Sequence, residues 1–162
     1  IVGTDKKSFK ALVIGAGGVA PSAILALKKC NINNISISNR TSDKALFLNK
    51  QFPTINIVEW KNLINETDKF DIIINATSLG LKKGNEFEML IDKTKPNLIY
   101  IDTIYNPFQT KMIKHLKTKN IKTYNGLNMF LYQGQKSFYI WNKINPEIDD
   151  KLVKILENKI KK

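Results

Sequence analysis

The sequence predicts an α/β fold: a doubly wound, mostly parallel sheet of about six strands with helices on both faces. Short β-type runs alternate with helical stretches along the chain, which is the pattern of parallel strands joined by helical crossovers. Two runs, Leu12–Ile14 and Ile72–Ile74, are continuously apolar, as in strands buried on both faces. The length of 162 residues fits one domain, and no linker divides it, so residues 1–162 are expected to form a single domain.

The first strand and the first helix enclose a glycine-rich run. The strand-like stretch is Lys10–Ile14, the helix-like stretch is Val19–Lys29, and Gly15-Ala16-Gly17-Gly18 lies between them. By their apolar and β-branched residues, further strands are expected at Asn34–Ser38, Ile55–Glu59, Asp71–Asn75, Leu98–Asp102 and Lys122–Tyr124. Helices are expected between them at Asp43–Lys50 and Thr110–Lys119, with a weak turn near Asn62–Glu66.

Two helices are expected to end the chain. In the first, Leu127–Asn142, apolar residues step by four and three along one face, which predicts that this face is core: Leu127, Leu131, Gly134, Phe138 and Trp141. Met129 and Gln133 fall on an adjoining strip, and the spacing alone leaves open whether they face a ligand. In the second, Glu147–Lys159, Asn145 is expected as the cap and Pro146 at the first helical position.

Composition narrows the function classes. The net charge of +12 favours anionic partners, but the lysines are scattered and there is one arginine, which argues against nucleic-acid binding. No apolar run is long enough to span a bilayer, so no membrane partner is expected. One cysteine, Cys30, and no His/Cys cluster predict neither an internal disulfide nor a metal site. A cytoplasmic protein that binds anionic small molecules is expected.

The glycine-rich run is typical of a Rossmann-like dinucleotide site. Gly15 permits a tight turn, Gly17 lets backbone N–H groups approach a pyrophosphate, and Ala20 permits close packing of helix on strand. The N-terminus of the following helix then offers donors and a partial positive charge. The alternative is a glycine turn that serves packing only.

Arg40, the only arginine in the chain, stands about twenty residues after this run. Sites for NAD usually carry Asp or Glu there, which accepts hydrogen bonds from the ribose 2′-OH. Here the local sequence is Asn39-Arg40-Thr41, with Lys44 close behind. A guanidinium can hold a 2′-phosphate with two parallel hydrogen bonds. The sequence therefore favours NADP(H), the alternative being a surface arginine without a ligand.

Two more segments follow expected strands at the carboxyl edge, where ligands of open α/β sheets bind. The first, Asn75–Leu81, carries small polar residues that could line a cofactor channel or cap a turn. The second, Asp102–Pro107, includes Tyr105, whose hydroxyl could face a substrate or anchor the loop. His115 lies mid-helix without an acidic neighbour in sequence and is expected to be exposed rather than catalytic.

Taken together, five motifs resemble shikimate dehydrogenase, and specifically its cofactor-binding half. They follow in order from about Lys10 to Pro146: Gly15-Ala16-Gly17-Gly18, Asn39-Arg40-Thr41, Asn75 to Leu81, Asp102 to Pro107 with Thr110, and Asn125 to Met129 leading to Gln133 and Trp141. The resemblance implies NADP-dependent, reversible reduction of 3-dehydroshikimate to shikimate, a step of aromatic amino-acid biosynthesis in the chorismate pathway.

The resemblance also implies roles for individual residues. The pyrophosphate would lie in the run Gly15, Ala16, Gly17, Gly18 and Val19. Asn39, Arg40, Thr41 and Lys44 would hold the 2′-phosphate end. Thr77, Ser78, Thr103, Gly126 and Met129 would border the ribose and the nicotinamide, and Tyr105 and Gln133 would reach the substrate.

The family's catalytic pair, a Lys and an Asp, belongs to an amino-terminal substrate domain that precedes the glycine turn. Asp5 lies too close to Gly15 to leave room for the helix between them in the family, so no catalytic residue is assigned in this chain. Alone, it is expected to bind NADP(H) and catalyse little. The alternatives are a related quinate/shikimate or methylene-tetrahydrofolate-type reductase, and a non-catalytic NADP-binding module.

Overall fold

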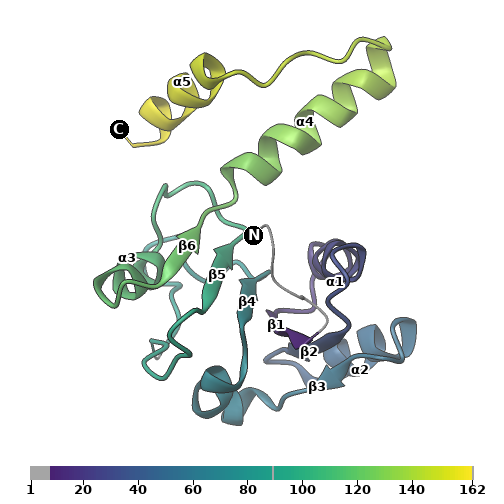
Figure 1. The fold of residues 1–162 in the computed structure, drawn as a ribbon, viewed down its shortest axis with the longest axis vertical. Coiled ribbons are helices and arrows are strands. Elements are labelled where there is room, and N and C mark those ends of the chain that lie inside the picture. Colours follow the sequence, from purple (N-terminus) through teal and green to yellow (C-terminus); the bar gives the residue numbers. More distant parts are fainter. Residues whose placement is uncertain (1–7, 89, 162) are drawn as a thin grey trace.

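The computed structural model describes residues 8–88 and 90–161 and confirms the predicted fold class. It forms one parallel sheet of six strands in the order β3-β2-β1-β4-β5-β6 (Figure 1). The strands are β1 (Lys10–Ile14), β2 (Asn34–Ser38), β3 (Asn56–Ile57), β4 (Ile72–Asn75), β5 (Ile99–Asp102) and β6 (Lys122–Tyr124). The order reverses between β1 and β4, and open parallel sheets bind ligands at the carboxyl ends of strands at such a reversal.

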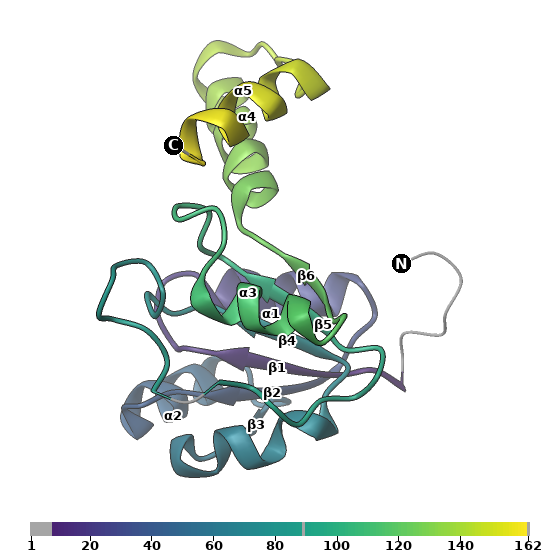
Figure 2. The ribbon, with the colours of Figure 1, turned by 90° about the vertical axis from the view of Figure 1, so that its left-hand side faces the viewer.

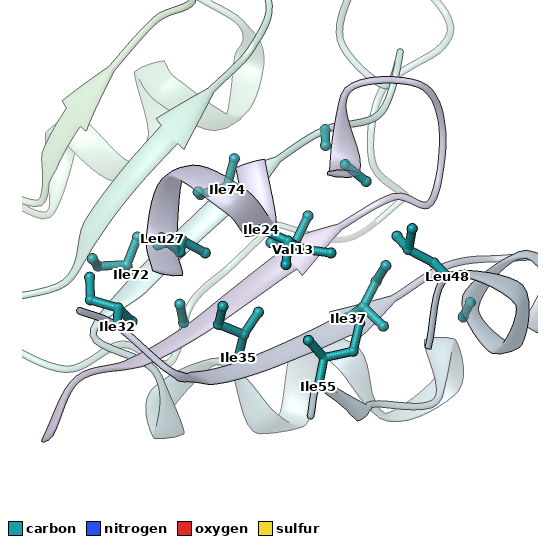
Figure 3. Close-up of a cluster of buried hydrophobic side chains, with 14 of the residues drawn as sticks. Val13, Ile24, Leu27, Ile32, Ile35, Ile37, Leu48, Ile55, Ile72 and Ile74 are labelled. Carbon is teal, nitrogen blue, oxygen red and sulfur yellow. The ribbon is translucent and has the colours of Figure 1, made fainter. Parts of the chain in front are cut away.

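Helices cover both faces of the sheet. The helices that pack on the sheet are α1 (Ala20–Lys29), α2 (Ser42–Gln51), the 3₁₀ segment η2 (Trp60–Lys69) and α3 (Lys111–Thr118), whereas α4 (Leu127–Asn142) and α5 (Asp150–Ile160) extend away from it (Figures 1 and 2). One core cluster joins α1 and α2 to the sheet through side chains such as Val13 and Ile74 (Figure 3). A second joins η2 and α3 to the opposite face through Ile14 and Ile73. Successive residues of β1 and β4 thus enter opposite clusters, which explains their unbroken apolar runs.

The segment between β3 and β4 is more ordered than the sequence predicted. The strand expected at Ile55–Glu59 is only Asn56–Ile57, and the weak turn is the ten-residue η2. Thr67, fully buried, donates a hydrogen bond to the backbone oxygen of Lys93 at 2.7 Å. This contact crosses 26 residues of sequence, so local pattern could not reveal it.

The predicted core face of α4 is wrong beyond its first turns. Leu127 and Leu131 are buried, but Phe138 is 43% and Trp141 78% exposed. The reason is visible in Figures 1 and 2: α4 leads away from the carboxyl end of β6, and most of its length has no sheet beneath it. The periodicity identified an apolar face correctly, but not what covers it.

The last helix also begins later than predicted. α5 starts at Asp150, with Asp149 as its cap: the Asp149 carboxylate accepts a hydrogen bond from the Leu152 N–H at 2.7 Å. Pro146 lies outside the helix, and its backbone oxygen accepts from the Gln135 side chain at 2.7 Å. The Asp149 cap also places a negative charge at the helix N-terminus, where it stabilises the helix.

His115 is another correction. Its side chain is 21% exposed, and Nε2 lies 3.0 Å from the Asp92 carboxylate and 3.2 Å from the Ile91 backbone oxygen. Lys119 pairs with the same carboxylate at 2.8 Å, and the Lys119 and His115 contacts lower the pKa of Asp92. Asp92 lies 23 residues from His115 in the sequence. The contacts of His115 and Lys119 with Asp92 connect the loop before β5 to α3.

Candidate dinucleotide-binding site

The glycine turn after β1 has a conformation that other residues would strain. Gly15 has φ +107°, and its N–H donates to the Ser38 backbone oxygen at 2.7 Å. A Cβ on Gly15 would lie 2.7 Å from Thr77 Cγ2 and 2.8 Å from the Ala76 backbone oxygen. The turn therefore lies in direct contact with the segment that follows β4, where both strands end.

Gly17 and Gly18, by contrast, face open space, since a Cβ on either would meet no atom within 4 Å. Among the described residues, none accepts a hydrogen bond from the N–H groups of Gly17, Gly18 and Val19. These donors precede α1, whose N-terminus carries a partial positive charge. The turn thus presents free donors to an accessible space, which is the requirement for binding an anion.

Asn39 connects this turn to the segment after β2. Its side-chain oxygen accepts from the Ala16 N–H at 3.0 Å, and its side-chain nitrogen donates to the Thr41 backbone oxygen at 2.8 Å. Arg40 and Lys44 are exposed and form no ion pair with any described residue. Two cations without counter-ions therefore stand beside the free donors of the glycine turn.

These segments enclose a pocket of about 290 Å³. Nine of the residues predicted to bind the cofactor line it: Gly15, Ala16, Gly17, Asn39, Arg40, Thr41, Lys44, Thr77 and Ser78. Four other lining residues were not predicted individually: Trp60, Ala76, Leu79 and Asn85. Ala76 and Leu79 lie within Asn75–Leu81, the segment predicted to line the cofactor site, although neither residue was predicted individually to bind the cofactor. Trp60, at the start of η2, and Asn85, in the segment between β4 and β5, reach the pocket from parts of the chain whose course the sequence did not reveal.

A buried hydrogen-bond network fixes the ends of β4 and β5 beneath this pocket. The Asn75 amide donates to the Asp102 carboxylate at 3.1 Å, and the Thr110 hydroxyl donates to the same carboxylate at 2.8 Å. Asn75 also accepts from the Thr77 N–H at 3.0 Å and from the Thr77 hydroxyl at 2.7 Å. Asn75 and Asp102 are fully buried. The network therefore holds Thr77 against the glycine turn.

Asp102 is the one ionisable carboxyl in this network. Burial raises the pKa of Asp102 above its ordinary value, while hydrogen bonds from the Ile104 N–H, Thr110 and Asn75 hold back that rise. Asp102 Oδ1 accepts from both Asn75 and Ile104, whereas Oδ2 accepts from Thr110, so loss of the Thr110 hydroxyl removes a hydrogen bond that Oδ1 cannot replace.

Thr110→Val tests the network. Thr110 donates to Asp102 and also caps α3 by accepting from the Ile113 N–H at 3.3 Å. We expect the valine variant to lose about 2–4 kcal/mol of unfolding free energy, from an unsatisfied acceptor and a lost cap. Urea denaturation measures this. Thr110→Ser keeps the hydroxyl and should stay within about 1 kcal/mol of the original chain; an equal loss in both variants would refute a role for the hydroxyl.

The remaining predicted residues lie outside the pocket lining. Thr103 and Gly126 are brought together, because a Cβ on Gly126 would collide with the Thr103 backbone oxygen. Tyr105 stacks on Phe130 of α4, with ring centroids 4.6 Å apart. Met129 is 44% exposed. The other three, Gly18, Val19 and Gln133, are not among the residues that line the pocket.

Comparison with known proteins agrees with this geometry. Residues 2–125 match the shikimate / quinate 5-dehydrogenase family. The chain is 47% identical over 151 residues to the shikimate dehydrogenase (NADP(+)) of Pelagibacter ubique, covering 93% of this chain and 56% of that protein. The chain spans about half the length of the curated relatives it matches.

A comparison with solved structures also matches this chain to shikimate dehydrogenases. The shikimate dehydrogenase of Aquifex aeolicus is 35% identical, with a TM-score of 0.75 over 86% of this chain and 50% of that one. The shikimate 5-dehydrogenase of Thermus thermophilus, solved in complex with NADP(H) and shikimate, is 26% identical, with a TM-score of 0.74 over 87% of this chain and 52% of that one. By sequence and by fold, the chain belongs to the shikimate / quinate 5-dehydrogenase family.

Proposed function

We propose that this chain is the NADP(H)-binding domain of a shikimate dehydrogenase, and that residues 1–162 act as one unit. The observation that carries the proposal is the pocket that joins the glycine turn after β1 to Arg40 and Lys44 after β2. The NADP(+) named for the Pelagibacter relative and the NADP(H) in the Thermus complex support it.

The residues present fit the cofactor. The free N–H groups at Gly17, Gly18 and Val19 suit a pyrophosphate, and the open space at both glycines leaves room for it. Among the described residues, the charged ones that line the pocket are Arg40 and Lys44, so no carboxylate in this part of the lining opposes a 2′-phosphate. Thr41, in the same lining, adds a hydroxyl donor. Charge and donor geometry thus favour NADP(H) over NAD(H).

The nicotinamide end would lie farther along the carboxyl edge. Thr77 and Ser78 would lie at its ribose, Thr103, Gly126 and Met129 beside the ring, and Tyr105 and Gln133 toward the substrate. The cofactor supplies the hydride, and this domain fixes its position and orientation. Gly126, packed on the Thr103 backbone, holds the start of α4 close to the end of β5.

The reaction proposed for the whole enzyme is reversible reduction of 3-dehydroshikimate to shikimate, in the chorismate pathway of aromatic amino-acid biosynthesis. Its catalytic Lys and Asp would come from a substrate domain that this chain does not include, in line with the half-length match to relatives. A cytoplasmic location is part of the proposal, since the one cysteine can form no internal disulfide. Among the described residues, no helix is both long and apolar enough to span a bilayer.

Binding of NADP(H) and oxidation of shikimate can be measured separately on this chain. We expect the 162-residue chain to bind NADP(H) but to oxidise shikimate at no more than a trace rate, because orientation and acid–base groups from the other half are missing. NADPH fluorescence measures binding, and absorbance at the reduced nicotinamide band measures turnover. A protein that joins the chain to its substrate domain should oxidise shikimate with NADP+. Enzymatic rates from the chain alone would refute the proposal that the catalytic groups lie in the other domain. A preference of the joined protein for quinate over shikimate would assign the alternative substrate.

A further inference from the structure

The loop between β5 and α3 carries Tyr105 and is fastened to the segment that begins α4. The Gly126 N–H donates a hydrogen bond to the Ile104 backbone oxygen at 3.0 Å. The Asn125 side-chain nitrogen donates to the Phe108 backbone oxygen at 2.9 Å. These two bonds hold the backbone on both sides of Tyr105. Because they reach only backbone atoms of the loop, they leave the direction of the Tyr105 side chain unspecified.

Phe130 of α4 contacts the Tyr105 ring directly. The two rings stack with centroids 4.6 Å apart and an interplanar angle of 23°, within the range of distances that stacked aromatic pairs favour. Within residues 8–88 and 90–161, the Tyr105 side chain makes no hydrogen bond and no second ring contact. The stack on Phe130 is therefore the aromatic contact available to orient the Tyr105 ring.

Core burial does not account for Phe130. It is 42% exposed, whereas Leu127, three residues earlier on α4, is buried. Gln133 follows Phe130 by three residues, so the two side chains are neighbours on the helix surface. Gln133 is the α4 residue assigned above to the substrate. Phe130 thus brings Tyr105 against the part of α4 where the substrate is proposed to bind.

We propose that Phe130 is a positioning residue for Tyr105: its ring holds the Tyr105 ring against α4, so that the hydroxyl is presented to the substrate beside Gln133. This inference rests on the proposed shikimate dehydrogenase function. Phe130 acts through Tyr105 and supplies no group to the reaction. Without the stack, the Tyr105 side chain is free to adopt other rotamers. Substrate affinity then falls in proportion to the fraction of molecules in which the hydroxyl is in place.

Steady-state kinetics of the protein that joins this chain to its substrate domain test the proposal. Phe130→Leu should raise KM for shikimate about two- to tenfold, the effect of losing an aromatic pair. Its kcat and its KM for NADP+ should stay within about twofold, because the lost contact concerns substrate binding alone. Phe130→Tyr keeps a ring for the stack and should keep KM for shikimate within about twofold of the original value.

Phe138 provides a matched control on the same helix. It is 43% exposed, close to the value for Phe130, and its ring has no aromatic partner among the described residues. Phe138→Leu should therefore leave both KM values and kcat unchanged. In the 162-residue chain, Phe130→Leu should melt within about 4 °C of the original and bind NADP+ equally well, since the residue is half-buried.

A double-mutant cycle shows whether Phe130 acts through the Tyr105 hydroxyl. Tyr105→Phe keeps the ring and removes the hydroxyl, and should itself raise KM for shikimate. Adding Phe130→Leu to Tyr105→Phe should then raise KM by less than about 1.5-fold more, whereas independent effects multiply.

Four results would overturn the positioning role and leave the proposed function standing. They are multiplying effects in the cycle, an unchanged KM for shikimate in Phe130→Leu, an unchanged KM in Tyr105→Phe, and an equal loss of NADP+ affinity in Phe130→Leu. Failure of the original joined protein to oxidise shikimate with NADP+ would instead overturn the proposed function.

Discussion

Arg40→Ala should weaken NADP+ binding by about ten- to a hundredfold and change NAD+ binding by less than about threefold. A hydrogen bond to a charged group contributes ~1.5–3 kcal/mol, and only NADP+ carries the 2′-phosphate. Arg40 is exposed, lines the pocket and has no ion-pair partner among the described residues, so its removal breaks no ion pair among them. Isothermal titration of both cofactors against the variant and the original chain measures the difference.

Two further variants separate the geometry of the guanidinium from the effect of its charge. Arg40→Lys keeps the charge but loses the two-pronged donor geometry, and should fall between the original chain and the alanine variant. Lys50→Ala removes a charge from the opposite end of α2, where Lys50 is exposed and outside the pocket, and should leave both affinities unchanged. Equal losses for NADP+ and NAD+ in Arg40→Ala would contradict a role in reading the 2′-phosphate.

Gly15→Ala should lower the stability of the fold, whereas Gly17→Ala should lower the affinity for NADP+. At Gly15, a positive φ and a Cβ 2.7–2.8 Å from Thr77 and Ala76 predict a loss of about 3 kcal/mol of unfolding free energy. This corresponds to a fall in melting temperature of roughly 6–12 °C. At Gly17 the added methyl meets nothing within 4 Å, so stability should change by less than about 1 kcal/mol.

Binding should show the reverse contrast for Gly17. Its methyl would stand where the pyrophosphate must approach the free N–H groups, so NADP+ affinity should fall at least about tenfold in a protein that melts almost normally. Thermal unfolding and titration on the same two variants provide both measurements. A Gly17→Ala variant that binds NADP+ normally would place the pyrophosphate elsewhere.

Much of this site could be predicted because its chemistry is local in sequence. The glycine turn is a strand–turn–helix signature, and Arg40 follows it at the spacing that a βαβ unit requires. The parallel sheet brings the ends of β1, β2 and β4 to one edge, so residues chosen as separate motifs converge on one pocket.

The features that could not be predicted depend on contacts between segments far apart in the sequence. Trp60 enters the pocket from the start of η2 and Asn85 from the segment between β4 and β5, and tertiary contacts such as that of Thr67 with Lys93 connect these two parts of the chain. His115 contacts Asp92, which lies 23 residues away in the sequence. The apolar face of α4 was identified from periodicity, but Trp141 shows that periodicity does not say what, if anything, covers such a face. Tyr105, which could have faced a substrate or anchored the loop, stacks on Phe130, a contact the spacing did not suggest.

The central claim is that this chain binds a dinucleotide and selects it by the 2′-phosphate. Its most direct test is the titration of the 162-residue chain with NADP+ and with NAD+ at one pH and one salt concentration. The structure predicts saturable, one-to-one binding of NADP+ that is at least about tenfold tighter than that of NAD+. Equal affinities, or tighter binding of NAD+, would contradict it.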